Sequence, residues 1–538
     1  MKDMRTRFIR IAAVAALLLG GTGIQARVVK IDVPDPATWK NDALAACNYG
    51  DTVLFDVPVI VNRNYNTVGL RMSVRRIFSP TNQAVPLSEE YKQLLALNGK
   101  AAFSLTGCGY HRNGERLHNL KARVTSRLEV EYISGTWEGN NTREAIERKV
   151  PSVDMKGQHN VLVCGANLEY YLVENIGTGY GADTYYEHQK QRKKVLTALS
   201  RIHADIYGLV EIEQGQTALA EIANDLTELA GDPYDYVNDG GSASGSYTKS
   251  GYVYRSDRIM PVGLLTRNNT VVQSRKMIQG FILIENDERF IFSINHFKAK
   301  SGTGTGKNAD QGDGQGIFNY NRTLEAISLL QNMASYQSFY EDKDVLIMGD
   351  LNAYAFEDPI RTLTDANMYD LHRYFHADSS DSYVYGEQAG YLDHAIANDA
   401  LIKQVTGMNA WHVNSDESDY YTYDKSNDQT VFRYSDHDPV LVGLRLDSTR
   451  SIPSSEYDPI EYTAIAVIDG ETFLTNVSET GDGEQHGYYE IYDITGHLAQ
   501  SITQITDSPC PVGNELPAGI YVIRVYYAGK VKALKLMK

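Results

Sequence analysis

Residues 343–352 read KDVLIMGDLN, an apolar run that ends on an acid and an amide. The apolar residues 345–348 are typical of a strand that is buried on both faces of its sheet. This strand delivers Asp350 and Asn352 to its end, and the edge of a sheet is where ligands usually bind. The stretch therefore predicts an α/β fold that presents polar side chains at the ends of its core strands.

The same arrangement recurs along residues 158–446, which we expect to form one domain. Other apolar runs also end on polar residues: VLVCGAN on Asn167, DIYGLVE on Glu211, FIFSINH on His296, AGYLDHAI with Asp393, and YSDHDPV with Asp436 and His437. Between the runs lie helical patterns, in one of which apolar residues recur with helical spacing from Val195 to Ile202. Strands that alternate with helices predict an α/β domain with buried sheets.

The strand-end residues are mainly carboxylates and amides, without a cage of cysteines or histidines. Such ligands favour a hard cation, Mg²⁺ first, with Mn²⁺ or Ca²⁺ as alternatives. Several acids crowded together without a cation would repel one another, so a bound metal ion explains the pattern economically. Glu213 lies two positions beyond Glu211 and would point the same way in a strand, so the residues alone leave that choice open.

His437 stands between Asp436 and Asp438 in YSDHDPV. A histidine that moves a proton needs another group to fix its tautomer. Adjacent residues of an extended chain point to opposite faces, so its two sequence neighbours are poorly placed to hold the ring. A partner from another strand end is required, and Asp393 fits by its chemistry.

The formal net charge is −17 and the pI about 5.3, which argues against broad attraction to polyanions. A phosphate substrate would then need a local basic patch or bridging cations. Candidates for phosphate binding lie in or near the motifs: Lys249, Lys298, Asn319 and Arg322. The stretch DGQGIFNYNR brings the last two to a predicted helix start, which favours anions.

The ends of the chain differ from its centre. Residues 1–26 combine a basic start with a short apolar run and read as a cleaved secretory signal, and no other segment is long and apolar enough to span a bilayer. Residues 27–150 and 462–538 alternate apolar and polar positions and predict two small β-domains, the second a β-sandwich, with a linker over 447–461. Of four cysteines, Cys47 and Cys108 could pair.

Six motifs in order resemble the endonuclease/exonuclease/phosphatase superfamily, and within it the secreted bacterial extracellular nucleases. They read GLVEIE, NHFKAK, DQGDGQGIFNYNR, GDLNAYAFEDPI, GYLDHAI and SDHDPV. The resemblance covers 158–446 and implies a four-layer α/β sandwich with two packed mixed sheets and a magnesium-dependent phosphodiester cleavage site. It also implies an OB-fold-like domain before the catalytic domain, and the C-terminal segment is similar to a type IX secretion sorting domain.

The resemblance also implies roles for single residues. Asn167, Glu211 and Asp436 look like metal-site residues, and His296 resembles the histidine that contacts the scissile phosphate. Asp350 and Asn352 resemble the pair that orients the attacking water and the phosphate. His437 resembles the second catalytic histidine, with Asp393 as its partner.

The sequence therefore predicts a metal-dependent nuclease that hydrolyses phosphodiester bonds of extracellular nucleic acid, with DNA as the expected substrate. It would be exported through the periplasm by the type IX secretion machinery and be secreted or attached to the cell surface. Two alternatives stay open: a phosphodiesterase or phosphatase of the same fold acting on lipid headgroups or inositol phosphates, and a surface binding protein that has lost catalysis.

Overall fold

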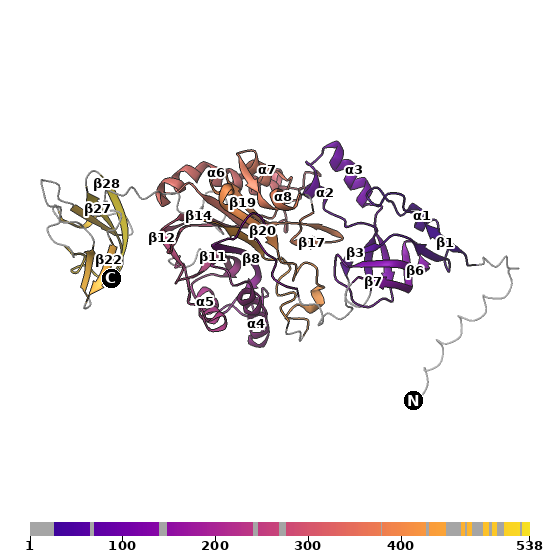
Figure 1. Cartoon of the computed structure of the whole chain (residues 1–538), viewed down its shortest axis with the longest axis horizontal. Helices are drawn as coiled ribbons and strands as arrows, with labels where there is room; N and C mark the ends of the chain where they lie inside the picture. Colours follow the sequence, from indigo (N-terminus) through magenta and orange to yellow (C-terminus); the bar gives the residue numbers. More distant parts are fainter. Residues whose placement is uncertain are drawn as a thin grey trace, which may run out of the picture. The chain divides into compact units, whose positions relative to one another are not determined.

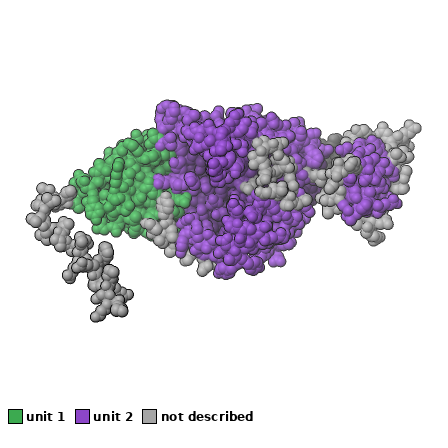
Figure 2. Space-filling view, turned by 180° about the vertical axis from the view of Figure 1, so that it is seen from behind, with its two compact units in different colours: residues 1–77, 96–146 green, residues 78–95, 147–538 purple. Residues whose placement is uncertain are grey.

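Figure 1 shows a computed structural model of the chain. The structure describes residues 26–64, 69–138, 148–239, 246–267, 276–377, 379–426, 430–447, 464–468, 471–475, 488–493, 498–502, 510–527 and 530–538. The predicted signal and nearly all of the predicted linker lie outside these ranges. Contacts divide the chain into two units, one formed by 1–77 with 96–146 and the other by 78–95 with 147–538 (Figure 2).

The first unit is built on one seven-stranded sheet. Its strands are β1 (Val28–Ile31), β2 (Thr52–Phe55), β3 (Val59–Asn64), β4 (Leu70–Ser73), β5 (Phe103–Thr106), β6 (Arg116–Ser126) and β7 (Glu129–Trp137). Strand β6 pairs with β2, β3 and β7, so β3, β4, β5, β7 and β6 close into a ring in which β5 and β7 are parallel. A ring leaves few open edges. The core of this unit includes the stacked rings of Phe55 and Phe103, whose centroids lie 5.2 Å apart.

The second unit holds two mixed six-stranded sheets. One has the order β10 (Tyr234–Tyr236), β11 (Thr248–Arg255), β9 (Ile206–Glu213), β8 (Val161–Tyr171), β21 (Val440–Leu444), β20 (Val405–Ala410). The other has the order β12 (Ile259–Arg267), β13 (Lys276–Leu283), β14 (Arg289–His296), β15 (Val345–Asp350), β19 (Asp393–Asn398), β16 (Met368–Asp370). A separate hairpin pairs β17 (Tyr383–Tyr385) with β18 (Gln388–Gly390).

Helices cover the outer face of each sheet (Figure 1). On one side lie α4 (Tyr185–Ile202) and α5 (Thr217–Ala230), and on the other α6 (Asn319–Tyr340), α7 (Asp358–Thr364) and α8 (Leu371–His376). Short 3₁₀ turns occupy η2 (Gly306–Asn308), η3 (Leu401–Gln404) and η4 (Asp419–Tyr421). Four layers result, as predicted, and the apolar positions expected from Val195 to Ile202 form the buried face of α4.

The inner faces of the two sheets form one apolar core. Val163 and Val210 from one sheet join Phe292, Ile294 and Met348 from the other, all essentially without exposure to solvent. The sheets meet closely at Gly208, where an added Cβ would lie 2.6 Å from the ring of Phe292. Close packing fixes the two sheets to each other, so the ends of their strands form one rigid edge.

Residues 78–95 belong to the second unit, which corrects the predicted boundary of a first domain over 27–150. This segment carries α2 (Pro80–Gln83) and most of α3 (Glu89–Asn98), whereas α1 (Asp42–Ala45) belongs to the first unit. Thr81 donates to the buried carboxylate of Glu357 at 3.0 Å, and the Ser79 amide donates to the Ala389 carbonyl at 2.8 Å. Such bonds between distant segments leave no periodic trace in the sequence.

The C-terminal region forms two small sheets around a core of its own, as the predicted β-sandwich requires. One contains β22 (Ala464–Ile468), β23 (Glu471–Thr475) and β26 (Cys510–Pro511), and the other β25 (Leu498–Ile502), β24 (Tyr488–Asp493), β27 (Ile520–Tyr527) and β28 (Lys530–Met537). Leu474 from the first sheet packs with Ile491 and Ile523 from the second. Cys47 and Cys108, in the other unit, are free thiols.

Within the described residues, no helix is both long and apolar enough to cross a bilayer.

Candidate active site

Three predicted catalytic residues lie side by side at the end of one sheet. Strand pairing sets His296 of β14 opposite Asp350 of β15, and Asp350 opposite Asp393 of β19. Each of the three side chains is at most 4% exposed. Strands β14 and β15 are parallel and end at this edge, whereas β19 is antiparallel to β15 and begins there with Asp393.

His437 is held by Asp393, as predicted. Its Nδ1 lies 2.7 Å from Oδ2 of Asp393, and that same oxygen accepts a hydrogen bond from the Ser382 hydroxyl at 2.8 Å. The ring of Tyr383 stacks on the imidazole, with centroids 4.6 Å apart. These contacts fix both the orientation and the tautomer of the histidine, so that Nε2 faces the other acids of the site.

Asp438, the other neighbour of His437, has a structural role instead. Its fully buried carboxylate accepts bonds from the amides of Asn414 and Ser415, from the Ser415 hydroxyl and from Nδ1 of His412. The carboxylate therefore fixes the loop that follows β20, and the two faces of the extended chain separate Asp438 from the catalytic edge.

Asp350 lies close to several of the other candidate site residues. Its Oδ2 lies 3.8 Å from Nε2 of His437, 3.7 Å from Nε2 of His296 and 3.3 Å from Nδ2 of Asn167. Its Oδ1 accepts the backbone amide of Asn352 at 2.9 Å. Burial raises the pKa of Asp350 to about 7, although His437 opposes the shift. A carboxyl group tuned to neutral pH is suited to accept a proton from water.

The pKa of His437 is also shifted by the neighbouring acids. Burial alone would lower its pKa, but Asp393, Asp436 and Asp350 around it outweigh burial and hold the pKa well above the ordinary value. The three acids therefore favour the protonated form of the imidazole, whose Nε2 lies 3.8 Å from Oδ2 of Asp350.

The end of strand β8 departs from regular geometry beside the acids. Glu169 and Tyr170 have φ values of 50° and 57°, and the pairing of β8 with β9 shifts between Asn167 and Tyr171. In β9, Glu211 has a φ of 59°, and its Oε2 accepts the amide of Tyr170 at 3.2 Å. Left-handed backbone at non-glycine residues is costly and gathers at functional sites.

Glu169 is a site residue that the sequence reasoning did not find. Its Oε2 is buried without a hydrogen-bond partner. Burial raises its pKa to about 8, and repulsion from Asp436 and Glu211 adds to that shift while Arg433 opposes it. Its sequence signal was only that of an acid two residues beyond Asn167, and the irregular backbone there means that strand alternation does not fix the face of its side chain.

Glu169, Glu211 and Asp436 form an acid cluster whose chemistry fits a hard cation. An orphaned carboxylate oxygen and mutual repulsion are what a bound divalent ion would relieve. As they stand, no three acid, histidine or cysteine side chains in the described ranges are close enough together to form a finished ligand set.

The hydrogen bonds of the two residues favour Glu211 over Glu213 as the candidate site residue. Glu213 is fully buried and accepts bonds from the amides of Val173, Glu174 and Asn175 and from the Asn175 side chain, at 2.6–2.8 Å. It therefore organises the loop after β8. Glu211 remains partly exposed, and its Oε1 lies 3.6 Å from Nε2 of His296.

Two of the four residues predicted to bind phosphate are engaged inside the protein, which argues against that role. Lys249 is 1% exposed and pairs with Asp239 at 3.0 Å. Arg322 is fully buried, and its guanidinium donates to the carbonyls of Lys298, Ile317 and Gln315. Both cations stabilise the fold because a buried charge must be paired or hydrogen-bonded.

The other two lie at the surface of the same region. Lys298 is half-buried, with its ammonium 4.7 Å from the centre of the Phe318 ring. Asn319 begins α6 and donates to Asp358 at 2.9 Å. Lys298 lies two residues after His296 in the chain, so it stays a candidate for phosphate contact.

Comparison with known proteins agrees with this geometry. The model of the endonuclease/exonuclease/phosphatase family matches residues 158–437, just over half of the chain. The chain therefore belongs to that family, whose members are hydrolases of phosphoester bonds and include nucleases, phosphatases and phosphodiesterases. No curated protein matches the chain.

Solved structures with similarity to this chain include the following three. The human Nocturnin catalytic domain is 14% identical, with 53% of this chain and 94% of that chain covered and a TM-score of 0.35. A mannosyl-6-phosphatase from Bacteroides thetaiotaomicron is 16% identical (53% and 99% covered, TM-score 0.36). D. rerio TDP2, complexed with a single-strand DNA product, is 12% identical (52% and 97% covered, TM-score 0.34).

Proposed function

We propose that this protein is a metal-dependent nuclease that hydrolyses phosphodiester bonds, with DNA as its substrate. The observation that carries the proposal is the arrangement around Asp350. Oδ2 of Asp350 lies 3.8 Å from Nε2 of His437 and 3.7 Å from Nε2 of His296. The same two ring nitrogens lie 3.8 Å from Asp436 and 3.6 Å from Glu211, two members of the acid cluster. Hydrolysis of a phosphodiester needs these elements: a base for water, positive charge for the phosphate, and a site for a cation.

Each residue has a role that follows from its contacts. Asp350 accepts a proton from the attacking water, because burial holds its pKa near neutrality. His437, protonated and oriented by Asp393, donates a hydrogen bond to a non-bridging oxygen of the phosphate. Asn167 donates to Oδ2 of Asp350, and Nε2 of His296 lies 3.7 Å from the same oxygen, so both help to orient the carboxylate.

The acid cluster would hold the divalent cation, for which we propose Mg²⁺. When bound, such an ion neutralises charge on the phosphate and eases departure of the leaving oxygen. Removal of the ion should leave Glu169 and Glu211 to repel each other, so the chain's own carboxylates would protonate or move apart.

An aromatic stack beside the cluster supports a nucleic-acid substrate. Tyr170, whose amide binds Glu211, stacks on Tyr180 with centroids 5.1 Å apart, and Tyr180 lies 5.6 Å from Tyr247. Tyr180 and Tyr247 are 48% and 42% exposed. Exposed rings in a row next to a cleavage site offer bases a surface on which to stack. The closed strand ring of the first unit, with its parallel closing pair, supports an OB-like domain, a fold that binds oligonucleotides.

A single set of assays tests the function. The full chain is incubated with supercoiled plasmid, linear DNA, RNA, mannose 6-phosphate and an inositol phosphate, each with Mg²⁺ and with a chelator. We expect cleavage of DNA that requires the cation and is absent from the His437→Ala variant. Release of phosphate from the sugar or inositol substrate, with DNA intact, would instead favour a phosphatase, and DNA cleavage unaffected by chelator would reject the metal-dependent mechanism.

We also propose that the protein is exported through the periplasm and delivered by the type IX secretion machinery. Residues 1–26 support the first step by their basic start and apolar run. The self-contained core of the C-terminal sheets supports the second, because a separately folded tail is suited to recognition and removal. Deletion of 462–538 should abolish export to the surface but leave nuclease activity in the purified protein, and its failure to alter export would refute the sorting role.

A further inference from the structure

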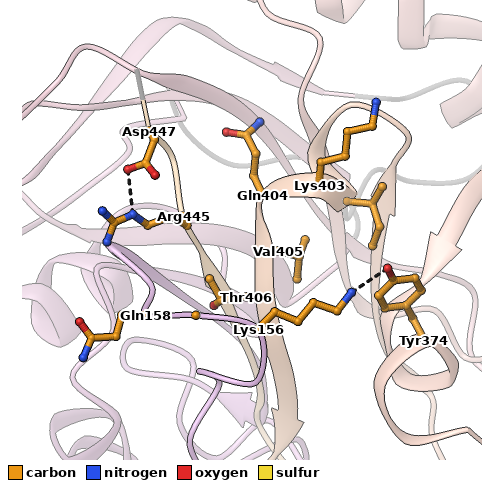
Figure 3. Close-up of a pocket in the computed structure, with 11 residues that line it drawn as sticks. Lys156, Gln158, Tyr374, Lys403, Gln404, Val405, Thr406, Arg445 and Asp447 are labelled. Carbon is orange, nitrogen blue, oxygen red and sulfur yellow. Dashed lines mark hydrogen bonds and ion pairs between the residues drawn. The ribbon is translucent and has the colours of Figure 1, made fainter. Parts of the chain in front are cut away.

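A cleft of about 650 Å³ opens in the second unit, away from the residues described above (Figure 3). Five segments line it: the residues before β8, helix α8, the turn η3, the start of β20 and the residues after β21. The side chains that matter below are those of Lys156, Tyr374, Lys403, Arg445 and Asp447. A volume of this size holds a small organic molecule.

The cleft lies at the opposite end of the strands from the catalytic residues. Strand β21 begins at Val440, three residues after His437, and it ends at Leu444, directly before Arg445. Strand pairing sets Leu444 opposite both Val161, the first residue of β8, and Val405, the first residue of β20. The length of the sheet thus separates the two sites, and the cleft is no extension of the acid cluster.

The charge of the cleft is opposite to that of the chain. Three cations, Lys156, Lys403 and Arg445, line it together with one carboxylate, Asp447, in a protein of net charge −17. Arg445 and Asp447 form an exposed pair, 2.8 Å from Nε to Oδ1. Such a pair contributes little stability, so an incoming anion can compete for the guanidinium.

Lys156, one of the three cations, is already held in place. The Lys156 ammonium donates to the Tyr374 hydroxyl at 2.7 Å and lies 3.9 Å from the centre of the same ring (Figure 3). Because the tyrosine oxygen accepts this bond, its own O–H is left to donate to a ligand. The backbone of Lys156 is tied to β20 by a bond to the Thr406 carbonyl, and the Thr406 hydroxyl donates to Val153. A preorganised donor pair reduces the entropic cost of binding.

We propose that this cleft is a second binding site, for a phosphate monoester of nucleotide size. The Lys156 ammonium and the Tyr374 hydroxyl would bind the phosphate, Lys403 and Arg445 would add positive charge at other points of the cleft, and the aliphatic side chains of Ile402 and Val405 would contact the organic part. The source is either a free mononucleotide or the phosphorylated end of a strand, which present the same group. The anion site stands on the cleft alone, whereas the choice of a nucleotide rests on the proposed nuclease function.

Binding is tested by calorimetry on the full chain carrying His437→Ala, in chelator, so that neither hydrolysis nor the cation-dependent site contributes. The probes are inorganic phosphate, adenosine 5′-monophosphate, adenosine and a short 5′-phosphorylated oligonucleotide. A triple variant, Lys156→Gln, Lys403→Gln and Arg445→Gln, is compared with a matched control that removes three exposed cations elsewhere: Lys92→Gln, Lys121→Gln and Arg201→Gln.

We expect the monophosphate to bind the parent and the control alike, and to bind the triple variant about tenfold or more weakly, since each lost contact removes a charge-assisted bond. Adenosine should not bind. If the monophosphate binds and the oligonucleotide does not, the ligand is a free mononucleotide. If the oligonucleotide also binds, the ligand is the phosphorylated end of a strand. Equal affinity in the two triple variants, no binding to the parent, or adenosine as tight as its monophosphate would overturn the site. A nuclease assay that succeeds or fails leaves these outcomes unchanged, so the two proposals fail separately.

Discussion

Asp393 and His437 are 44 residues apart in the chain, yet Oδ2 of one lies 2.7 Å from Nδ1 of the other. The bond joins the first residue of β19, in one sheet, to the residues just before β21, in the other. The histidine of the catalytic edge is therefore held across the sandwich rather than by its sequence neighbours. Its partner on the other side is Asp350, so the ring is fixed between two carboxylates of the opposite sheet.

The pair should behave as one unit in kinetics. Asp393→Asn and His437→Ala should each lower kcat by roughly 10²–10⁴-fold, because the first removes the group that sets the tautomer and the second the ring itself. The double variant should lose little more than either single variant, since residues that act together are not additive. Steady-state cleavage of a labelled duplex measures the cycle, and additive losses would separate the two residues.

Ser382 should act as a positioning residue for the same pair. Ser382→Ala removes the hydroxyl that donates to Oδ2 of Asp393, and we expect kcat to fall about threefold to tenfold, the worth of one net hydrogen bond. KM should stay constant, and the imidazole proton shift of His437 in the NMR spectrum should move. Ser382→Thr restores the hydroxyl and should recover most of the rate, which a general packing defect would not allow.

The polar residues at the strand boundaries could be predicted from the sequence, because each apolar run marks a buried strand and the run stops where the strand does. His296 and Asp350 end their apolar strands, Asp393 begins the antiparallel strand beside them, and regular pairing brings the three together. Glu169 was missed because it follows Asn167 in a bulged segment, where the apolar pattern is broken and the face of each residue is not set by alternation. Its role depends on backbone angles that no spacing encodes.

Arg322 and Lys249 show the opposite error. In the sequence, a lysine or arginine that stabilises the fold looks the same as one that binds substrate. Only the structure shows which carbonyls or acids surround the charged group. Arg322 donates hydrogen bonds to three carbonyls, and Lys249 forms an ion pair with one buried carboxylate. The segment 78–95 was assigned to the wrong unit for a related reason, because its bonds reach Glu357 and Ala389, far along the chain.

Glu211 and Glu213 offer a matched pair on one strand. Glu211→Gln should raise the Mg²⁺ concentration needed for half-maximal rate and lower kcat, with little change in melting temperature, because its carboxylate is exposed to the site. Glu213→Gln should instead destabilise the fold by about 2–4 kcal/mol, since a buried acceptor of four bonds is replaced by a group that also donates. Metal titrations and thermal melts of both variants decide the assignment, and a reversed result would exchange their roles.

The tyrosine stack predicts a preference for bases over bare backbone. Tyr180→Ala and Tyr247→Ala should each raise KM about fivefold or more for an oligonucleotide with bases beside the cleaved bond, the loss expected for one stacking contact. KM for the same backbone with abasic residues at those positions should be unaffected. Tyr420→Ala removes a similarly exposed tyrosine outside the stack and serves as control. Equal effects on both substrates would mean that the stack only shapes the loop.

His412 predicts how stability changes with pH. Burial alone would lower its pKa, but the hydrogen bond to Asp438 and the nearby charges of Asp381 and Asp416 outweigh burial and raise the pKa to about 9. In the unfolded chain the pKa is about 6.5. The folded protein therefore binds the proton more tightly, and the stability gained is complete below pH 6.5 and is lost as the pH rises through 9. Thermal melts between pH 6 and 10 should show His412→Gln less stable than the parent at pH 6 to 7, with the difference shrinking toward pH 10. A difference that is constant over this range would mean that the imidazole contributes through packing and its neutral hydrogen bond, and that its charge is not coupled to folding.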